Sequence, residues 1–250
     1  MKLNSIRILG VRVNKTSKEE VLVCVKNFLN ENRKFLIVTP NPEILVEAAR
    51  NKKFAAVLNS AEIAIADGVG LKLADLSLEI IKGRQLMMEL FKLADDLALK
   101  IYLLGSTEKV NQEAVMKATR EYPNAKVAGA AGALLNSQGE PVGGQESTTG
   151  KAIVTEINQF KPDLLFVAFG APKQELWVSR VLPKLKVGGV MVVGGSFDYF
   201  VGGSSVPKLV LSLGLEWLWR LIKEPWRAKR IFTAVFLFPL LLLTNTSEVQ

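Results

Sequence analysis

The sequence predicts an α/β fold in which a largely parallel sheet is flanked by helices. Short apolar runs alternate with segments of helical periodicity along the chain up to about residue 205. These apolar runs are continuous rather than alternating, which is typical of strands buried on both faces. The 250 residues, 49% of them hydrophobic, are sufficient for a large core. We therefore expect Rossmann-like layers over residues 1–205 and a helical appendage over residues 206–250.

The periodicity places the elements as follows. The segment Arg7–Val13 is expected to form a bent strand or a small hairpin. The expected strands are Phe35–Val38, Glu62–Ala66, Lys100–Leu104, Lys126–Ala128, Asp163–Ala168 and Gly189–Val193. The expected helices are Lys18–Asn32, a helix capped by Asn41 with Pro42 in its first turn, Gln85–Leu99, Glu108–Glu121 and Thr149–Phe160. Residues 129–150, rich in Gly, Ser and Thr, are expected to form a flexible connection or lid.

The composition excludes several kinds of chemistry. The chain has no histidine, so it cannot hold a Ser-His-Asp or Cys-His catalytic couple or a metal site built from imidazoles. Its one cysteine, Cys24, cannot form an internal disulfide or hold an iron–sulfur cluster. Catalysis must therefore depend on carboxylates, hydroxyls, amides, Lys and Arg side chains, and backbone dipoles.

Small or polar residues follow five of the predicted strands and lead into helices. These segments are Thr39-Pro-Asn41, Asp67-Gly68, Gly105-Ser-Thr107, Gly170-Ala-Pro172 and Gly194-Gly-Ser196. In open α/β sheets, ligands bind beyond the carboxyl ends of the strands, and helix N-termini there favour phosphate groups. Together the five segments predict a crevice for a phosphate-bearing ligand.

Known phosphate-binding motifs narrow the choice of ligand. A dinucleotide fingerprint is missing, because Leu73 stands where the third glycine after Gly68-Val-Gly70 is required. The sequence contains neither a P-loop nor an Asp-x-Asp pair that would hold a divalent metal against a diphosphate. We expect a nucleotide-type ligand held by helix ends and side chains, with no essential metal and no cofactor.

The C-terminal region differs in composition from the rest of the chain. Between Lys208 and Arg230, six basic residues outnumber two acidic ones, so this stretch carries half of the formal charge of +8. The following segment, Ile231–Leu243, has no charge. As a helix it would extend about 20 Å, short of the roughly 30 Å hydrocarbon layer of a membrane. Pro239 is expected to interrupt it.

Two interpretations of this region compete. It could be a last core helix or an interface between copies of a homo-oligomer. We favour a monotopic membrane anchor, because tryptophans stand among the basic residues and each basic residue near an anionic leaflet adds about 1 kcal/mol. The residues expected to meet the membrane surface are Arg220, Lys223, Trp226, Arg227 and Arg230. Nucleic acid is not expected as a partner, because no aromatic-basic strand motif or zinc module accompanies the charge.

Four segments carry a family resemblance by their order and spacing. They are Val38-Thr-Pro-Asn-Pro-Glu-Ile44, Ala66-Asp-Gly-Val-Gly70, Val167-Ala-Phe-Gly-Ala-Pro-Lys-Gln-Glu-Leu-Trp177 and Val193-Gly-Gly-Ser-Phe-Asp198. Together they resemble the WecB/TagA/CpsF family of glycosyltransferases, and residues 213–227 are similar to the membrane-associated appendage of that family. The similarity extends from about residue 5 to residue 230.

The resemblance implies an inverting hexosyltransferase. Such an enzyme moves an N-acetylmannosamine-type sugar from a UDP-sugar donor to a polyprenyl-diphosphate-linked GlcNAc acceptor. The reaction belongs to the synthesis of a wall polymer, such as teichoic acid, or of a surface polysaccharide. The resemblance also implies a peripheral location at the cytoplasmic face of the cell membrane.

The family's functional residues can be matched to this chain. Asp67 matches the proposed general base, although an aspartate before glycine also often caps a helix. The residues expected to bind substrate are Thr39, Asn41, Arg84, Gly170, Lys173, Gln174, Glu175, Gly195, Ser196 and Phe197. Gln174 and Glu175 are expected to hydrogen-bond the sugar or the uridine, and Lys173 to neutralise a diphosphate.

The sequence departs from the family pattern in several ways, among them a shorter segment between Asp67 and Glu79 and no histidine in the region 129–135. Ile80 stands where a functional arginine is expected, so Arg84 or Lys82 would have to supply that charge. Ser205-Val-Pro207 replaces an expected Arg-Ala-Pro run. These departures favour an alternative function, a non-catalytic scaffold that binds nucleotide sugars at the membrane. A soluble nucleotide-sugar epimerase is a third interpretation, which would need no lipid acceptor and no membrane tail.

Overall fold

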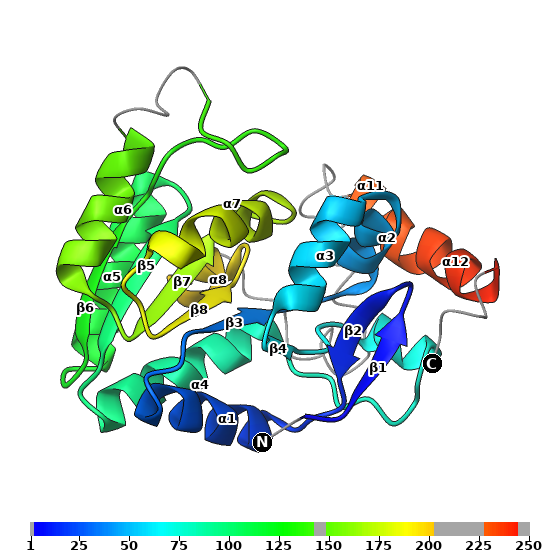
Figure 1. Ribbon diagram of the computed structural model, residues 1–250, viewed down its shortest axis with the longest axis horizontal. Coiled ribbons are helices and arrows are strands. Elements are labelled where there is room, and N and C mark those ends of the chain that lie inside the picture. Colours follow the sequence, from blue (N-terminus) through cyan, green and yellow to red (C-terminus); the bar gives the residue numbers. More distant parts are fainter. Residues whose placement is uncertain (1–2, 143–148, 203–227, 245–250) are drawn as a thin grey trace.

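A six-stranded parallel sheet forms the centre of the protein (Figure 1). The computed structural model describes residues 3–142, 149–202 and 228–244. The sheet has the strand order β4-β3-β8-β7-β5-β6. Its strands are β3 (Phe35–Val38), β4 (Ile63–Ala64), β5 (Lys100–Gly105), β6 (Lys126–Ala130), β7 (Leu164–Ala168) and β8 (Gly189–Val192). The predicted α/β fold with a largely parallel sheet is confirmed.

Helices cover both faces of the sheet and create two separate cores. On one face lie α2 (Pro42–Arg50), α3 (Lys52–Ser60), α6 (Thr149–Phe160) and α7 (Lys173–Val181). On the other lie α1 (Lys18–Asn30), α4 (Gly83–Asp96), α5 (Glu108–Glu121) and α8 (Ser196–Phe200). Strand β3 is apolar at every position because both of its faces are buried. Leu36 and Val38 belong to the first core, whereas Phe35 and Ile37 belong to the second.

The N-terminal segment forms the predicted hairpin. Strands β1 (Ser5–Ile8) and β2 (Val11–Asn14) pair antiparallel through a two-residue turn. Both turn residues, Leu9 and Gly10, have positive φ angles, 49° and 77°, as the favoured two-residue hairpin turn requires. The hairpin belongs to the first core, together with α2 and α3.

Some boundaries differ from the predicted ones. Strand β4 is shorter than the predicted Glu62–Ala66, although the N–H of Ile65 still donates to the carbonyl of Val38. Helix α4 begins at Gly83, before the predicted Gln85. In the region 129–150, Leu135 and Pro141 form an isolated antiparallel bridge, and residues 143–148 are outside the described part of the chain.

A C-terminal helical segment packs on α2. It consists of α11 (Ala228–Phe232), a π-helical turn η4 (Thr233–Leu237) and α12 (Phe238–Thr244). The predicted interruption at Pro239 is wrong, since the segment stays helical past this residue. The wider π turn just before it accommodates a ring that would clash with the carbonyl four residues earlier in a regular α-helix. The predicted boundary near residue 205 lies outside the described residues.

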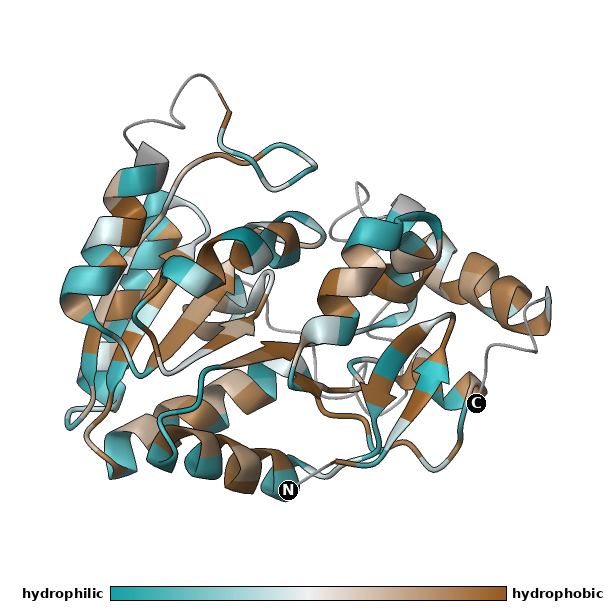
Figure 2. Ribbon diagram, in the orientation of Figure 1, coloured by the Kyte–Doolittle hydropathy of each residue, from teal (hydrophilic) through white to brown (hydrophobic). Residues whose placement is uncertain are grey.

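The C-terminal helix is apolar around most of its surface (Figure 2). Phe238 and Leu242 are buried in the first core. Its exposed large apolar side chains are Phe232, Val235, Phe236, Leu240 and Leu243. Within the described ranges, no helix has both the length and the apolarity needed to cross a bilayer. The segment is therefore partly a core helix and partly an exposed apolar surface.

Candidate active site

The predicted ligand-binding segments meet at one edge of the sheet. Because all strand pairs of the six-stranded sheet are parallel, the residues that follow its strands gather at the carboxyl edge. Asp67, Thr39, Gly194 and Gly170 follow four adjacent strands, β4, β3, β8 and β7, which span about 15 Å at the usual strand spacing. The neighbours β3 and β8 lead to α2 and α8 on opposite faces, and such a divergence opens a crevice.

Asp67 lies at this edge beside the first residue of α4. Its backbone N–H donates to the carbonyl of Pro40 at 2.8 Å, which connects the ends of β4 and β3. A methyl group added to Gly83 would lie 3.3 Å from Asp67 Oδ2 and 3.1 Å from Thr39 Cγ2. Asp67 is half-buried, and the N-terminus of the 14-residue helix α4 favours a negative charge beside it. The three residues form a compact corner around one carboxylate.

The N-cap position of the helix that follows Asp67 is held by a glycine. This 3₁₀ helix, η1 (Val69–Leu73), has Gly68 at its N-cap and no hydrogen bond from the side chain of its N-cap residue. The segment packs closely on α2 instead, because a methyl group added to Gly70 would lie 2.9 Å from Pro42 Cγ. Gly68 has a φ of 115°, which favours glycine. This packing fixes the backbone directly after the carboxylate.

Thr39 and Asn41 occupy the loop between β3 and α2. The side chain of Asn41 accepts a hydrogen bond from the N–H of Ile44 at 2.9 Å, which confirms its predicted role as the cap of α2. Thr39 is 8% exposed and contributes its methyl group to the corner at Gly83. Their predicted contact with the donor remains a prediction.

Gln174 connects two glycine loops at the carboxyl edge. Its Oε1 accepts hydrogen bonds from the N–H groups of Gly170 and Gly194, both at 3.1 Å, and its Nε2 donates to Glu175 Oε1 at 3.0 Å. Gln174 is 2% exposed. Both ends of the Gln174 amide thus hydrogen-bond to protein groups, and the side chain is not exposed for contact with a ligand.

Glu175 is completely buried in the first turn of α7. Burial raises the pKa of its carboxyl group to about 7, because the charged form loses its hydration. Hydrogen bonds from the Gln174 side chain and from the backbone oppose the shift. Burial therefore favours the protonated form of this carboxyl group over the charged form.

The other predicted substrate-binding residues differ in accessibility. Gly170 and Gly195 are uncrowded, since a methyl group on either would meet no atom within 4 Å in the part of the chain that the structure describes. Lys173 is half-buried at the start of α7. Ser196 donates its hydroxyl to the carbonyl of Val193 at 2.6 Å. Phe197 lies wholly within the second core, so its side chain supports α8 from inside.

Arg84 lies between α4 and α8. Its guanidinium is 4.6 Å from the centre of the Tyr199 ring, a cation–π arrangement. Arg84, Ser196 and Tyr199 line a small pocket together with Met87, Met88 and Phe200. Ile80, at the position where an arginine is expected, packs against the first core. That Arg84 or Lys82 supplies the missing charge remains a prediction.

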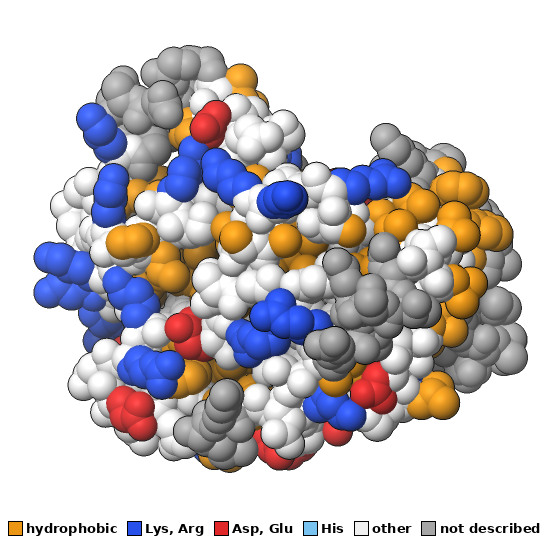
Figure 3. Space-filling view, turned by 45° about the vertical axis from the view of Figure 1, so that its right-hand side comes forward, with side chains coloured by type: hydrophobic (Ala, Val, Ile, Leu, Met, Phe, Trp, Pro, Cys, Tyr) orange, Lys and Arg blue, Asp and Glu red, His pale blue; other side chains and the backbone are white. Residues whose placement is uncertain are grey.

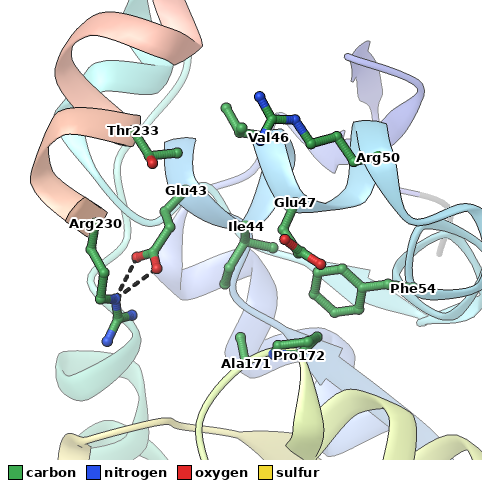
Figure 4. A pocket seen from close by; sticks show the side chains of 10 residues that line it. All are labelled: Glu43, Ile44, Val46, Glu47, Arg50, Phe54, Ala171, Pro172, Arg230 and Thr233. Carbon is green, nitrogen blue, oxygen red and sulfur yellow. Dashed lines mark hydrogen bonds and ion pairs between the residues drawn. The ribbon is translucent and has the colours of Figure 1, made fainter. Parts of the chain in front are cut away.

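A second pocket separates α2 and α3 from the β7–α7 loop (Figure 4). Glu43 and Arg230 close one end, where Arg230 Nε lies 2.6 and 2.8 Å from the two carboxylate oxygens. Phe54 lies at the other end, and Ala171 and Pro172 form the opposite wall. Arg230, predicted to meet the membrane surface, thus joins the C-terminal helix to α2. Arg220, Lys223, Trp226 and Arg227 lie outside the described residues.

Sequence reasoning missed Gly83, Tyr199 and Glu43. Gly83 opens a helix, and a glycine at such a position can signal a close approach of another group. Tyr199 and Glu43 carry no comparable signal, because their partners are distant in the sequence. In the part of the chain that the structure describes, no three His, Cys, Asp or Glu side chains group as a metal site would require.

Replacing Gly83 with alanine tests the corner around Asp67. Alanine favours a helix over glycine by about 1 kcal/mol, so stability should not fall. The added methyl must displace Thr39 or Asp67 by a few tenths of an ångström, and we expect kcat to fall about tenfold, since a misplacement of 1 Å can cost 10²-fold. Thr39→Ser, which removes the crowded methyl, should restore part of the rate in the double variant. If Gly83→Ala has the kcat of the wild type, the geometry around Asp67, Thr39 and Gly83 does not affect the reaction.

The comparisons with known proteins establish the class of this protein as a glycosyltransferase. Residues 6–249 match the model of the glycosyl transferase WecG/TagA/CpsF family, and the chain belongs to that family. The resemblance predicted from the four sequence segments is thus confirmed.

Three relatives illustrate the match. Proteins from Bacillus spizizenii and Bacillus subtilis are 30% and 31% identical over 82% and 83% of this chain and 78% and 79% of their own length. A protein from Staphylococcus aureus is 30% identical over 90% of this chain and 87% of its own. All three are named N-acetylglucosaminyldiphosphoundecaprenol N-acetyl-beta-D-mannosaminyltransferase.

Proposed function

We propose that this glycosyltransferase moves an N-acetylmannosamine-type sugar from a UDP-sugar to a polyprenyl-diphosphate-linked GlcNAc, with inversion at the anomeric carbon. The main support is the position of Asp67, a half-buried carboxylate at the carboxyl edge of the sheet, within a chain that matches mannosaminyltransferases over most of their length. Wall-polymer or surface-polysaccharide synthesis is the corresponding process.

The proposed reaction needs one proton acceptor. The hydroxyl oxygen of the acceptor sugar attacks the anomeric carbon while the bond to the UDP oxygen breaks on the opposite face. Asp67 takes the hydroxyl proton, and UDP leaves with the bonding electrons. The glycine loops after β7 and β8 let the backbone approach the donor closely, and the N-terminus of α4 offers a positive dipole end nearby.

The C-terminal helix supports a peripheral location at the membrane, where a lipid-linked acceptor resides. Apolar side chains gather on the right of Figure 3, the side on which this helix lies in Figure 1. Arg230 and Thr233 of the helix line the same pocket as Ala171 and Pro172 of the β7–α7 loop. A helix lying in the membrane interface would bring this pocket close to the surface. We propose the cytoplasmic face, where UDP-sugars are available.

A donor panel with a defined acceptor tests the proposal. UDP-ManNAc, UDP-GlcNAc and UDP-GalNAc are each incubated with a short polyprenyl-diphosphate-GlcNAc, with and without EDTA. We expect UDP release that requires the acceptor, is fastest with UDP-ManNAc and is unchanged by EDTA. The anomeric configuration of the product, determined by NMR, should be the opposite of that of the donor. No transfer from any donor, or retention of configuration, would contradict the proposal.

A non-catalytic nucleotide-sugar-binding scaffold is the second candidate. This candidate is favoured by Ile80, an apolar residue that packs against the first core at the position where a functional arginine is expected. This candidate predicts UDP-sugar binding in calorimetry without acceptor-dependent UDP release. The same donor panel therefore separates the two functions.

A further inference from the structure

Gln174 is the only described side chain that bonds to both glycine loops at the centre of the carboxyl edge. Gly170 follows β7 and Gly194 follows β8, and these strands are neighbours in the sheet. Each loop directs one N–H group at the same oxygen, Gln174 Oε1, at 3.1 Å. The last backbone hydrogen bond between these chain segments runs from the N–H of Val193 to the carbonyl of Val167 at 2.9 Å, and beyond it the buried Gln174 amide joins the two loops.

Among the described residues, both loops are uncrowded on the side away from this amide. A methyl group on Gly170, Gly194 or Gly195 would meet no atom of the described ranges within 4 Å. Gly170 and Gly194 also have φ angles of 80° and 53°, which other residues rarely adopt. The loops thus present bare backbone outward while one side chain holds them from within.

Glu175 accepts a hydrogen bond from the other end of the Gln174 amide. Two N–H donors face one end of this amide, so that end must be the oxygen, and the NH₂ end must find an acceptor. Glu175 Oε1 is that acceptor, at 3.0 Å. Its Oε2 is buried and has no hydrogen-bond partner among the described residues. Burying an acid costs free energy, and the one side chain that hydrogen-bonds this acid among the described residues is Gln174, which joins the two loops.

We propose that Gln174 and Glu175 are positioning residues of the donor site: Gln174 sets the separation of the two glycine loops that receive the UDP-sugar, and Glu175 orients the Gln174 amide. Neither side chain contacts the donor. This assignment rests on the proposed function for the identity of the ligand, and it replaces the expectation that both residues hydrogen-bond the sugar or the uridine.

Amide hydrogen exchange tests the connection without any need for activity. In Gln174→Met, which keeps the length of the side chain but removes both polar atoms, exchange at the N–H groups of Gly170 and Gly194 should rise about tenfold, the effect of losing one hydrogen bond. Ser179→Ala is the control, since it removes one hydrogen bond on the same helix, to Leu176, away from the loops. Unchanged exchange at either glycine would overturn the proposal.

Kinetics test the role of Glu175. Glu175→Gln keeps an acceptor for the Gln174 amide and resembles the protonated acid, so the KM for UDP-ManNAc should stay within about twofold of wild type. Glu175→Met removes the acceptor, and KM should rise about tenfold with little change in kcat. A side chain needed only for stability would shift the melting temperature and leave KM unchanged.

The outcomes are distinguishable. Wild-type KM in a folded Glu175→Met would overturn the orienting role. If Glu175→Met does not fold, the KM for UDP-ManNAc is compared between Glu175→Gln and Gln174→Met. An equal rise of KM in both variants would also overturn the orienting role of Glu175. If wild-type protein transfers no sugar, the proposed function fails, while the exchange experiment still decides whether Gln174 holds the loops.

Discussion

Asp67→Asn should reduce kcat by about 10²- to 10⁴-fold, the usual contribution of a general base. Asparagine has nearly the same shape as aspartate, so the corner with Thr39 and Gly83 should keep its geometry. It cannot take the proton of the acceptor hydroxyl. The KM for the donor should therefore change little, and the loss should appear in kcat, measured as UDP release at saturating donor and acceptor.

A matched control separates this effect from a general loss of charge. Asp96→Asn makes the same substitution at an exposed residue at the end of α4, whereas Asp67 lies beside the start of that helix. It should turn over at the wild-type rate. Both variants should melt within a few degrees of wild type, since neither side chain belongs to the apolar core. A full rate in Asp67→Asn would remove this residue from the proton transfer.

The main elements of the fold could be predicted because strands and helices leave different periodicities in the sequence. Phe35–Val38 is the clearest case, since a strand buried on both faces must be apolar at every position. The start of α4 was predicted less well. No side chain caps this helix, so the sequence carries no start signal at Lys82 or Gly83.

The path of the chain past Pro239 could not be predicted for a similar reason. A proline normally ends a helix, because its ring clashes with the carbonyl four residues earlier. The helix can continue past it when the preceding turn is wide enough to avoid this clash. The π turn at Thr233–Leu237 is a property of the backbone that no single residue type announces. The expected break is therefore absent.

The candidate site could be predicted only as far as topology determines it. Asp67, Thr39, Gly170 and Gly194 had to converge once their strands were parallel and adjacent. Roles that depend on a hydrogen-bond network are different. The Gln174 amide bonds to residues on two loops and to its own neighbour Glu175, and nothing in the sequence distinguishes this arrangement from contact with a sugar.

Polar substitutions on the exposed face of the C-terminal helix should abolish most of the binding to anionic vesicles. Phe236 and Leu240 are 62% and 55% exposed and lie four residues apart, and the Phe236 ring lies 5.1 Å from that of Phe232. Burying a large apolar side chain contributes about 1.5–3 kcal/mol. The double variant Phe236→Asn, Leu240→Asn should thus bind vesicles of phosphatidylglycerol and phosphatidylethanolamine about 10²- to 10⁴-fold more weakly in co-sedimentation.

Substitution is a sharper test than truncation, because the same helix also contributes to the core. Deleting it would remove Phe238 and Leu242 and uncover α2, so lost binding could reflect damage to the fold. The control replaces two apolar residues of similar exposure elsewhere, Val23→Asn and Leu97→Asn, which are 48% and 49% exposed on α1 and just after α4. It should bind vesicles as wild type does. Equal binding by both double variants would show that this face of the helix is not the membrane contact.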